Sequence, residues 1–328
     1  MTIAVTGSIA TDHLMTFPGR FADSLVVDQL DKLALSFLVD DLDIRRGGVA
    51  ANIAFAMACL GQHPVLVGSV GEDFADYRSW LERHGVDCES IHVSLTRHTA
   101  RFICTTDQTM AQLASFYAGA MTEAREIELA PIAARVGPLD LVVIGPNDPE
   151  AMLRHTEECR KRGYAFAADP SQQLAWAEGD LIRQLIEGAA YLFSNDYEAA
   201  LIEKKTGWDA AEIVDRVGTR VVTHGPDGVR VYRKGEPEVV VPAIAGVEAV
   251  DPTGVGDAFR AGYLAAVEND LSVERAAQLG CAVAASVVET TGTQEYVLSR
   301  EAFLRRFGSA YGADAAAEVG PRFTFPRP

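Results

Sequence analysis

The sequence has little positive charge, few cysteines and no hydrophobic run long enough to cross a membrane. Its 29 Lys and Arg residues stand against 46 Asp and Glu residues, which gives a formal net charge of -17. Because phosphate backbones and anionic lipids bind clustered positive charge, this balance excludes a general nucleic-acid or membrane-surface binder. We therefore expect no nucleic-acid or membrane partner, and any anionic ligand needs a local site.

The cysteines and the amino terminus also exclude several classes of protein. The five cysteines are far apart and form no CxxC pair, so a zinc or redox site is not indicated. The amino terminus, MTIAVTGSIA, has no basic segment before its apolar residues, as a secretory signal would. The least charged run, residues 47–61, is shorter than the roughly 20 residues of a membrane span. These features predict a cytoplasmic protein with reduced thiols.

Apolar runs bounded by turn residues alternate with segments of helical spacing. This alternation is typical of βαβ units on a parallel sheet, and no linker divides the chain, so we expect one α/β unit over residues 1–328. The predicted buried strands are 3–9, 65–70, 139–146, 164–170, 189–195 and 220–225, and the clearest helices are 147–163 and 195–207.

Two segments break this alternation. Residues 14–46 and 91–117 carry alternating, Thr-rich patterns that suit antiparallel strands better than crossover helices. We interpret them as one small β-sheet lid, of the kind that excludes water from phosphoryl transfer. The alternative is two ordinary edge hairpins that do not move.

The stretch DPTGVGDAFRAG, residues 251–262, is a glycine-rich turn that leads into a helix. Unpaired N–H groups and the helix dipole favour an anion at such a helix start. The turn matches neither the GxxxxGK[ST] nor the GxGxxG pattern. It places the N–H groups of Gly254, Val255 and Gly256 beside the Asp257 carboxylate, which could act as general base on a hydroxyl that attacks a bound phosphoryl group. A simple helix cap is the alternative for Asp257.

This stretch resembles the carboxy-terminal signature of the PfkB, or ribokinase-like, carbohydrate and nucleoside kinases. Residues 47–61 with Gly71 resemble the family's amino-terminal signature, NDYE at 195–198 its NxxE motif, and THGPDG at 223–228 its nucleotide segment. The resemblance implies an α/β fold with a central, mostly parallel sheet flanked by helices and a small β-sheet lid. It also implies phosphorylation of a primary alcohol by ATP with the help of Mg²⁺.

The resemblance further implies roles for the motif residues. Asp257 is the base, and the turn of Gly254, Val255 and Gly256 is the anion hole; the family usually has a small residue in place of Val255, and often Thr in place of Pro252. Asn195 and Glu198 are expected to organise Mg²⁺ through water, because Mg²⁺ keeps part of its hydration shell. The predicted nucleotide-binding residues are Asn195, Thr223, Gly225 and Gly228.

Within the family, the sequence resembles the actinobacterial type of adenosine kinase most, in segments such as AADPSQQLA and TGTQE. The expected reaction is therefore transfer of the γ-phosphate of ATP to the 5′-hydroxyl of adenosine. A carboxylate such as Asp12 can accept hydrogen bonds from both hydroxyls of a ribose diol, and Phe102 and Phe116 offer flat faces to a purine. The predicted substrate-binding residues are Ser8, Asp12, Ser36, Gly48, Asn52, Phe102, Phe116, Gln172 and Gln173.

Other interpretations of these residues stay open. Asp12 could shape a turn, Asn52 could cap its helix and the two phenylalanines could be core residues. A sugar kinase or another purine nucleoside kinase of the same family is the second candidate function, and a non-catalytic nucleoside-binding regulator is the third. Asp257 disfavours the regulator, because a binding protein needs no base there. The lid edges predict a homodimer, and the acid-rich turn at Asp251 could hold a monovalent cation such as K⁺.

Overall fold

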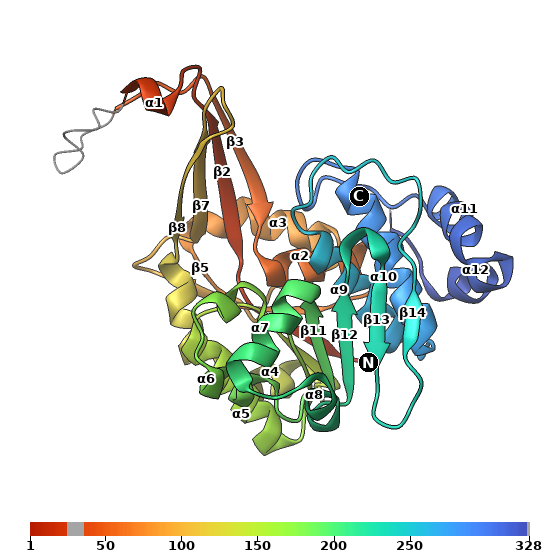
Figure 1. Ribbon diagram of the computed structural model, residues 1–328. Coiled ribbons are helices and arrows are strands. Elements are labelled where there is room, and N and C mark those ends of the chain that lie inside the picture. Colours follow the sequence, from red (N-terminus) through yellow and green to blue (C-terminus); the bar gives the residue numbers. More distant parts are fainter. Residues whose placement is uncertain (25–35, 327–328) are drawn as a thin grey trace.

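The computed structural model describes residues 1–24 and 36–326 (Figure 1). Its central sheet has the strand order β14-β13-β12-β11-β10-β9-β1-β4. All six predicted strands are present in it and lie parallel, whereas the last two strands form an antiparallel hairpin at one edge that was not predicted. The strands are β1 Ile3–Thr6, β4 Val65–Val67, β9 Leu141–Ile144, β10 Ala165–Ala168, β11 Tyr191–Asn195, β12 Thr219–Thr223, β13 Val229–Tyr232 and β14 Val239–Val241.

Helices cover both faces of this sheet. Alternate residues of β1 show why, because Ile3 and Val5 belong to the core on one face while Ala4 belongs to the core on the other. The first face carries α2 Val49–Cys59, α9 Val255–Glu268 and α10 Val273–Val288, with α3 Ala75–Arg83, α11 Arg300–Tyr311 and α12 Ala313–Val319 beside them. The second carries α4 Leu129–Val136, α5 Pro149–Arg162, α6 Gly179–Ile186, α7 Asp196–Thr206 and α8 Ala210–Arg216.

The helix pair α9 and α10 packs closely through two glycines. A Cβ on Gly262 would lie 2.7 Å from the Leu279 carbonyl oxygen, and a Cβ on Gly280 would lie 2.8 Å from the Phe259 carbonyl oxygen. A larger residue at either position would push the two helices apart. This contact fixes the position of α9, which begins at the glycine-rich turn.

A second sheet, with the order β3-β2-β7-β8, projects from the main domain (Figure 1). Its strands are β2 Ala10–Thr16, β3 Asp41–Gly47, β7 Ala100–Thr106 and β8 Gln112–Tyr117. This is the predicted small lid sheet, built from two excursions of the chain. The expectation of antiparallel pairing is wrong at its centre, where β2 and β7 pair in parallel. Each is the first strand of its excursion and starts at the same level, with Ala10 opposite Ala100, so the two run in the same direction.

The lid also differs from its predicted limits. Its first strand begins at Ala10, before the predicted start at residue 14. The segment His92–Ser94 forms β6, which pairs with β5 Ser69–Gly71 outside the lid. Residues 25–35 of the first predicted excursion lie outside the described residues. The short helix α1 Phe21–Ser24 and the 3-10 turns η2 Glu72–Phe74, η3 Gly119–Glu126, η4 Ser171–Ala175, η5 Gly225–Asp227 and η6 Gly320–Arg322 complete the described structure.

Over residues 1–24 and 36–326, no helix is both long and apolar enough to cross a bilayer.

Candidate active site

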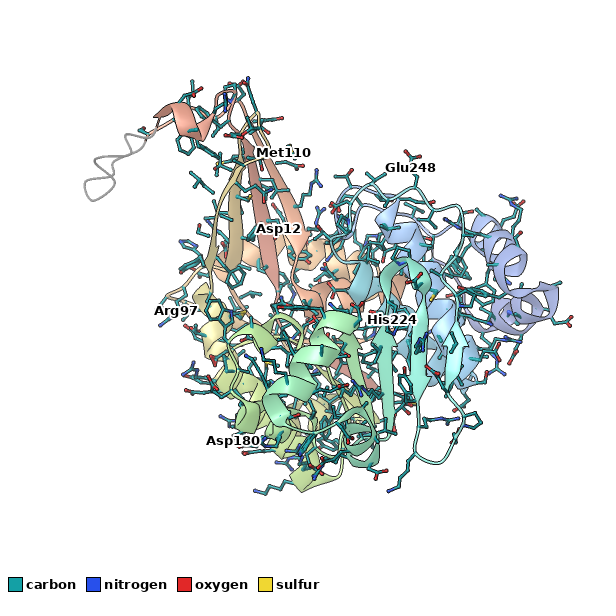
Figure 2. All side chains as sticks on the ribbon, in the orientation of Figure 1. Asp12, Arg97, Met110, Asp180, His224 and Glu248 are labelled. Carbon is teal, nitrogen blue, oxygen red and sulfur yellow. The ribbon has the colours of Figure 1, made fainter. Side chains whose placement is uncertain are left out.

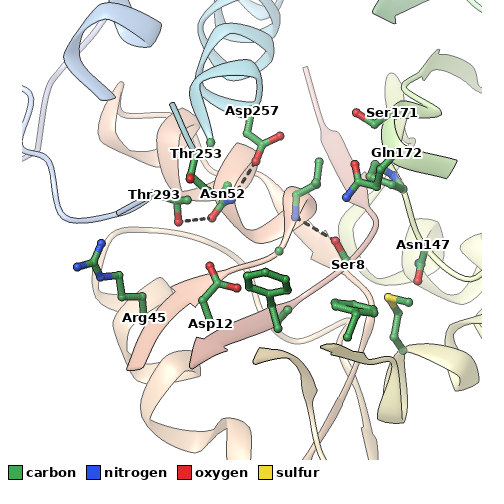
Figure 3. A pocket seen from close by; sticks show the side chains of 18 of the residues that line it. Ser8, Asp12, Arg45, Asn52, Asn147, Ser171, Gln172, Thr253, Asp257 and Thr293 are labelled. Carbon is green, nitrogen blue, oxygen red and sulfur yellow. Dashed lines mark hydrogen bonds between the residues drawn. The ribbon is translucent and has the colours of Figure 1, made fainter. Parts of the chain in front are cut away.

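A cavity of about 620 Å³ lies between the lid and the carboxyl ends of the central strands (Figure 3), and Figure 2 shows one of its residues, Asp12, on the lid strands. Ser8 follows β1, Asn147 follows β9 and Gln172 follows β10, so three neighbouring strands contribute to its floor. Ligands of open α/β sheets bind in such crevices outside the carboxyl ends of the strands. The predicted substrate residues that line the cavity are Ser8, Asp12, Gly48, Asn52, Phe102, Phe116, Gln172 and Gln173.

Ser36 is the predicted substrate residue that the structure does not bring to this cavity. It is exposed, just before β3, and lies next to residues outside the described ranges. Its role stays a prediction. Among the other predicted residues, the Gln172 side chain is exposed, whereas Gln173 Nε2 donates a 2.9 Å hydrogen bond to the Asn147 carbonyl oxygen. Gln172 is therefore the freer of the two amides.

One row of side chains across the lid forms the outer wall of the cavity. Asp12 on β2 is paired in register with Arg45 on β3 and with Phe102 on β7, and Phe102 is paired with Phe116 on β8. Residues paired in register project from the same face of a sheet, and all four line the cavity. The wall therefore has a charged half and an aromatic half. Phe116 is 54% exposed, so this ring is not part of a core.

The carboxyl group of Asp12 is perturbed by its position in this wall. Burial raises the pKa of Asp12 to about 6, although the nearby Arg45 guanidinium acts in the opposite direction. Figure 3 shows both side chains on the lid side of the cavity, with Asp12 across from Asn52 and Asp257. Arg45 was not predicted, because its place beside Asp12 depends on the register of β2 and β3.

The turn between β3 and α2 places the next part of the site. Gly48 has a φ of 93°, and a Cβ on it would lie 2.6 Å from the Ser8 carbonyl oxygen. The Ser8 hydroxyl accepts a 3.0 Å hydrogen bond from the Val49 N–H. Glycine thus allows the start of α2 to press against the end of β1, and Asn52 follows one turn later.

Asn52 connects three segments that are distant in the sequence. Its Nδ2 donates a 2.9 Å hydrogen bond to Oδ2 of Asp257, while its Oδ1 accepts from the Thr293 hydroxyl at 2.9 Å and from Gln294 Nε2 at 3.0 Å (Figure 3). The side chain makes no capping bond at the start of α2. Asn52 therefore orients the Asp257 carboxylate, a role that the sequence prediction missed because its partners lie more than 200 residues away.

Asp257 lies in the first turn of α9 and is 8% exposed. Its carboxylate contacts Asn52 and lies near Arg260, and the helix start has no side-chain cap. Burial raises the pKa of Asp257 to about 6, which Arg260 and the hydrogen bond from Asn52 partly offset. Such a carboxyl group is ionised at neutral pH and is a stronger base than an exposed aspartate.

The turn before Asp257 has the geometry of an anion site. Gly254 has a φ of 76°, and a Cβ on it would lie 2.9 Å from Cγ2 of Thr293. The Val255 N–H makes only a long 3.4 Å contact with the Pro252 carbonyl oxygen, and the N–H groups of Gly254 and Gly256 have no hydrogen-bond partner among the described residues. These donors are available to a ligand at the start of a helix. Val255 fits as the first helical residue despite its bulk.

A second cavity, of about 540 Å³, lies on the other side of this turn. The predicted nucleotide residues Thr223, Gly225 and Gly228 line it, together with apolar side chains such as Phe259. Gly254 and Asp257 face the first cavity, whereas Val255 and Gly256 face the second. Two ligands, one in each cavity, would therefore meet at the start of α9.

Asn195 and Glu198 form a reciprocal cap at the start of α7 and do not line this second cavity. Asn195 Oδ1 accepts from the Glu198 N–H at 2.7 Å, and Glu198 Oε2 accepts from the Asn195 N–H at 2.8 Å. The Glu198 charge nevertheless reaches the site, since it contributes to raising the pKa of Asp257. Over the described residues, no three His, Cys, Asp or Glu side chains gather as a metal cage. A single carboxylate still fits Mg²⁺, which is commonly held by one or two carboxylates, water and substrate phosphates.

The structure adds two residues that the sequence analysis did not assign to the site. Asp169 is fully buried and forms a 2.7 Å ion pair with Arg260. An acid at the end of the apolar strand β10 was the signal that could have identified it. Trp176 lines the cavity and is 85% exposed.

Several known proteins are similar to this chain over most of its length. A nucleoside kinase of Methanothermobacter thermautotrophicus is 30% identical to the chain over 269 residues, which cover 81% of this chain and 85% of that protein. The solved structure of the Burkholderia thailandensis nucleoside kinase in complex with inosine has 33% identity and a TM-score of 0.81, and the match covers 95% of this chain and 98% of that one. The same kinase in complex with ADP-inosine has 34% identity and a TM-score of 0.80, with 95% and 96% covered.

The family comparison covers most of the chain. The sequence pattern described as pfkB family carbohydrate kinase matches residues 10–300, a range that includes the lid strands, Asn52, the nucleotide segment and the turn before Asp257. The chain therefore belongs to the pfkB family of carbohydrate kinases.

Proposed function

We propose that this kinase transfers the γ-phosphate of ATP to the 5′-hydroxyl of a purine nucleoside, with adenosine as the acceptor, and so produces AMP and ADP. The observation that carries the proposal is the meeting of two cavities at the start of α9, where Asp257 faces the cavity that holds Asp12, Phe102 and Phe116. Residues 1–328 would act as one catalytic unit with the lid as a part of it.

The acceptor cavity has a place for each part of a nucleoside. Asp12 would accept hydrogen bonds from the ribose hydroxyls, supported by Ser8, Gly48 and the remaining N–H of Asn52. The aromatic half of the lid wall would cover the purine, and the exposed amide of Gln172 would bind its polar edge. With the sugar at Asp12, the base lies toward the rings and the 5′-hydroxyl toward Asp257.

The phosphoryl transfer would be carried by the residues of the turn. Asp257, oriented by Asn52, accepts the proton of the attacking 5′-hydroxyl. The N–H groups of Gly254, Val255 and Gly256 donate to the transferring phosphoryl group, while ATP occupies the cavity lined by Thr223, Gly225 and Gly228. Mg²⁺, held through water near Asn195 and Glu198, would neutralise phosphate charge when bound.

Two accessory proposals concern a cation and a partner. A monovalent cation such as K⁺ would bind at the turn of Asp251, whose carboxylate accepts from the N–H groups of Thr253 and Gly292. Activity that is unchanged between potassium and a bulky organic cation would exclude it. The lid leaves Leu42, Ile44 and Leu113 exposed near its two edge strands, which favours a homodimer through the lid. A monomer in sedimentation at micromolar concentration would contradict the dimer.

The experiment that tests the proposed function is ADP release with Mg²⁺, ATP and one acceptor at a time. Adenosine, inosine, guanosine, ribose and fructose should be compared side by side, and we expect adenosine to be used best. A preference for inosine or guanosine would support a nucleoside kinase but show that its preferred nucleobase is not adenine. A preference for ribose or fructose would exclude the purine site, and no turnover with any of the five would favour a nucleoside-binding regulator.

A further inference from the structure

Arg260 lies beside the turn of residues 254–257, between Asp169 and Asp257. It follows Asp257 by three residues on α9, so both side chains lie on the same side of the helix. Its Nη2 donates to Asp169 Oδ1 at 2.7 Å and to the Ser171 hydroxyl at 3.2 Å, while its Nη1 lies 3.9 Å from Asp257 Oδ1. The Arg260 side chain is 9% exposed. One buried guanidinium thus lies between two carboxylates, behind the residues that line the cavity.

The geometry of the Asp169 pair is not the one that would bind the two groups most tightly. A guanidinium and a carboxylate commonly form two parallel hydrogen bonds. Here Asp169 Oδ2 and Arg260 Nε are both buried without a hydrogen-bond partner in the described structure. The single bond through Nη2 leaves Nη1 directed toward the turn, where a Cβ on Gly256 would lie 2.6 Å from it. The guanidinium therefore packs directly against the backbone that precedes Asp257.

The charges around Asp257 come from several elements. Arg260 on α9 is the nearest cation, Glu198 on α7 is the further acid that acts on it, and the neutral Asn52 on α2 donates the hydrogen bond. Asp169, which follows β10, lies next to the same guanidinium. The Asp257 charge also contributes to raising the pKa of the buried Tyr296. Burial raises the pKa of Asp169 to about 7. Arg260 is thus the one cation among the described groups that act on Asp257.

We propose that Arg260, anchored by Asp169, is a positioning residue for Asp257: it fixes the carboxylate beside the glycine turn. The inference rests on the proposed function, since the base needs a hydroxyl to deprotonate. Asp169 has an anchoring role and does not bind substrate. Ser171, which has a φ of 45° and lines the cavity, connects this pair to the acceptor side.

The test compares three variants. Arg260→Gln alone leaves the buried Asp169 without its partner, so this variant can fail to fold. The double variant Arg260→Gln/Asp169→Asn removes both charges and keeps nearly the same shape. The matched control is Arg220→Gln/Glu203→Gln, which removes another ion pair of a buried arginine, with a 2.6 Å separation, far from Asp257 in the sequence.

We expect the Arg260/Asp169 double variant to fold and to lose kcat by about 10- to 100-fold, because a small misplacement of a catalytic group has effects of this size. KM for the nucleoside should change by less than about 2-fold, since Arg260 does not line the cavity. The acid limb of the kcat profile should move to higher pH, because loss of the cation disfavours the ionised carboxylate. The control should keep kcat and the pH profile.

Two results would overturn the inference. If the double variant folds and keeps wild-type kcat and an unchanged acid limb, the Arg260–Asp169 pair is only structural. The pair is likewise only structural if the Arg220→Gln/Glu203→Gln control loses as much kcat as the double variant. A readout that needs no turnover is the infrared titration of the Asp257 carboxyl, identified by its loss in Asp257→Asn. Its pKa should rise in the double variant even if wild-type protein phosphorylates no tested acceptor, so failure of the proposed function and failure of this inference are distinguishable.

Discussion

The two walls of the acceptor cavity are built in different ways. On the α9 side, Asp257 is 8% exposed and is held by Asn52 and Arg260, which are themselves buried and bonded. On the lid side, Phe116 is 54% exposed, and the rings lie on strands that project away from the core (Figure 1). The difference indicates that Asp257 and its partners are held in place by the main domain, whereas the positions of Phe102 and Phe116, which we propose bind the purine, depend on the lid.

The largest expected effect is a loss of kcat when Asp257, on the α9 side of the cavity, is replaced. Asp257→Asn keeps the shape of the side chain but removes the base, so kcat should fall by about 10²- to 10⁴-fold with little change in KM. Steady-state ADP release measures this, and a thermal melt shows whether the variant is folded. An Asp257→Asn protein that keeps most of its rate would remove Asp257 as the base.

A smaller loss should follow from loosening the same wall. Asn52→Ala removes the hydrogen bond that orients Asp257, and we expect kcat to fall by about 10- to 100-fold. Thr293→Val is the matched control, because it removes one bond to Asn52 Oδ1 but leaves the bond between Asn52 and Asp257. Equal losses in the two variants would show that the network supports the fold generally rather than the base.

The lid wall should respond in KM instead of kcat. Replacing Phe102 and Phe116 with Ala removes the flat faces, and since stacking of one nucleobase contributes about 1–3 kcal/mol, KM for adenosine should rise by about 5- to 150-fold. Replacement of both by Leu keeps apolar volume without flat faces and should recover only part of the affinity. A variant that uses adenosine and ribose with unchanged ratio would exclude the purine clamp.

The smallest expected effect is a pH dependence, of kcat through Asp257 on the α9 side and of KM through Asp12 on the lid side. Burial raises the pKa of both Asp257 and Asp12 to about 6, so each loses its charge as the pH falls through that value. Between pH 7.5 and pH 6, kcat should fall by about twofold through Asp257, and KM should rise through Asp12. In Asp12→Asn, the KM dependence should vanish while the kcat dependence stays. If KM of Asp12→Asn still rises as the pH falls, a group other than Asp12 causes the pH dependence of KM.

The sequence was most informative where one segment determines the outcome. The six central strands are continuous apolar runs, because both faces of a parallel sheet are buried, and all six were predicted. The β13–β14 hairpin was missed, because its strands alternate buried and more exposed residues at the edge of the sheet and so do not form continuous buried runs. The parallel pairing of β2 with β7 depends on how two distant excursions meet, which local patterns do not record.

The same distinction applies to the site. The turn at 254–257 and the lining residue Asp12 could be predicted from local motifs. The bond between Asn52 and Asp257, the Asp12–Arg45 register pair and the burial of Asp169 are tertiary facts. An acid before a proline is typical of a turn, and only the packing of α9 against the end of β10 shows its buried partner Arg260.

The most direct test of the two-wall account measures kcat and KM of Asp257→Asn and of the Phe102→Ala/Phe116→Ala double variant with both adenosine and ribose. We expect the aspartate variant to lose kcat for both acceptors alike, and the phenylalanine variant to have a higher KM for adenosine with unchanged kinetics for ribose. A phenylalanine variant that loses kcat for both acceptors, with KM unaffected, would contradict it.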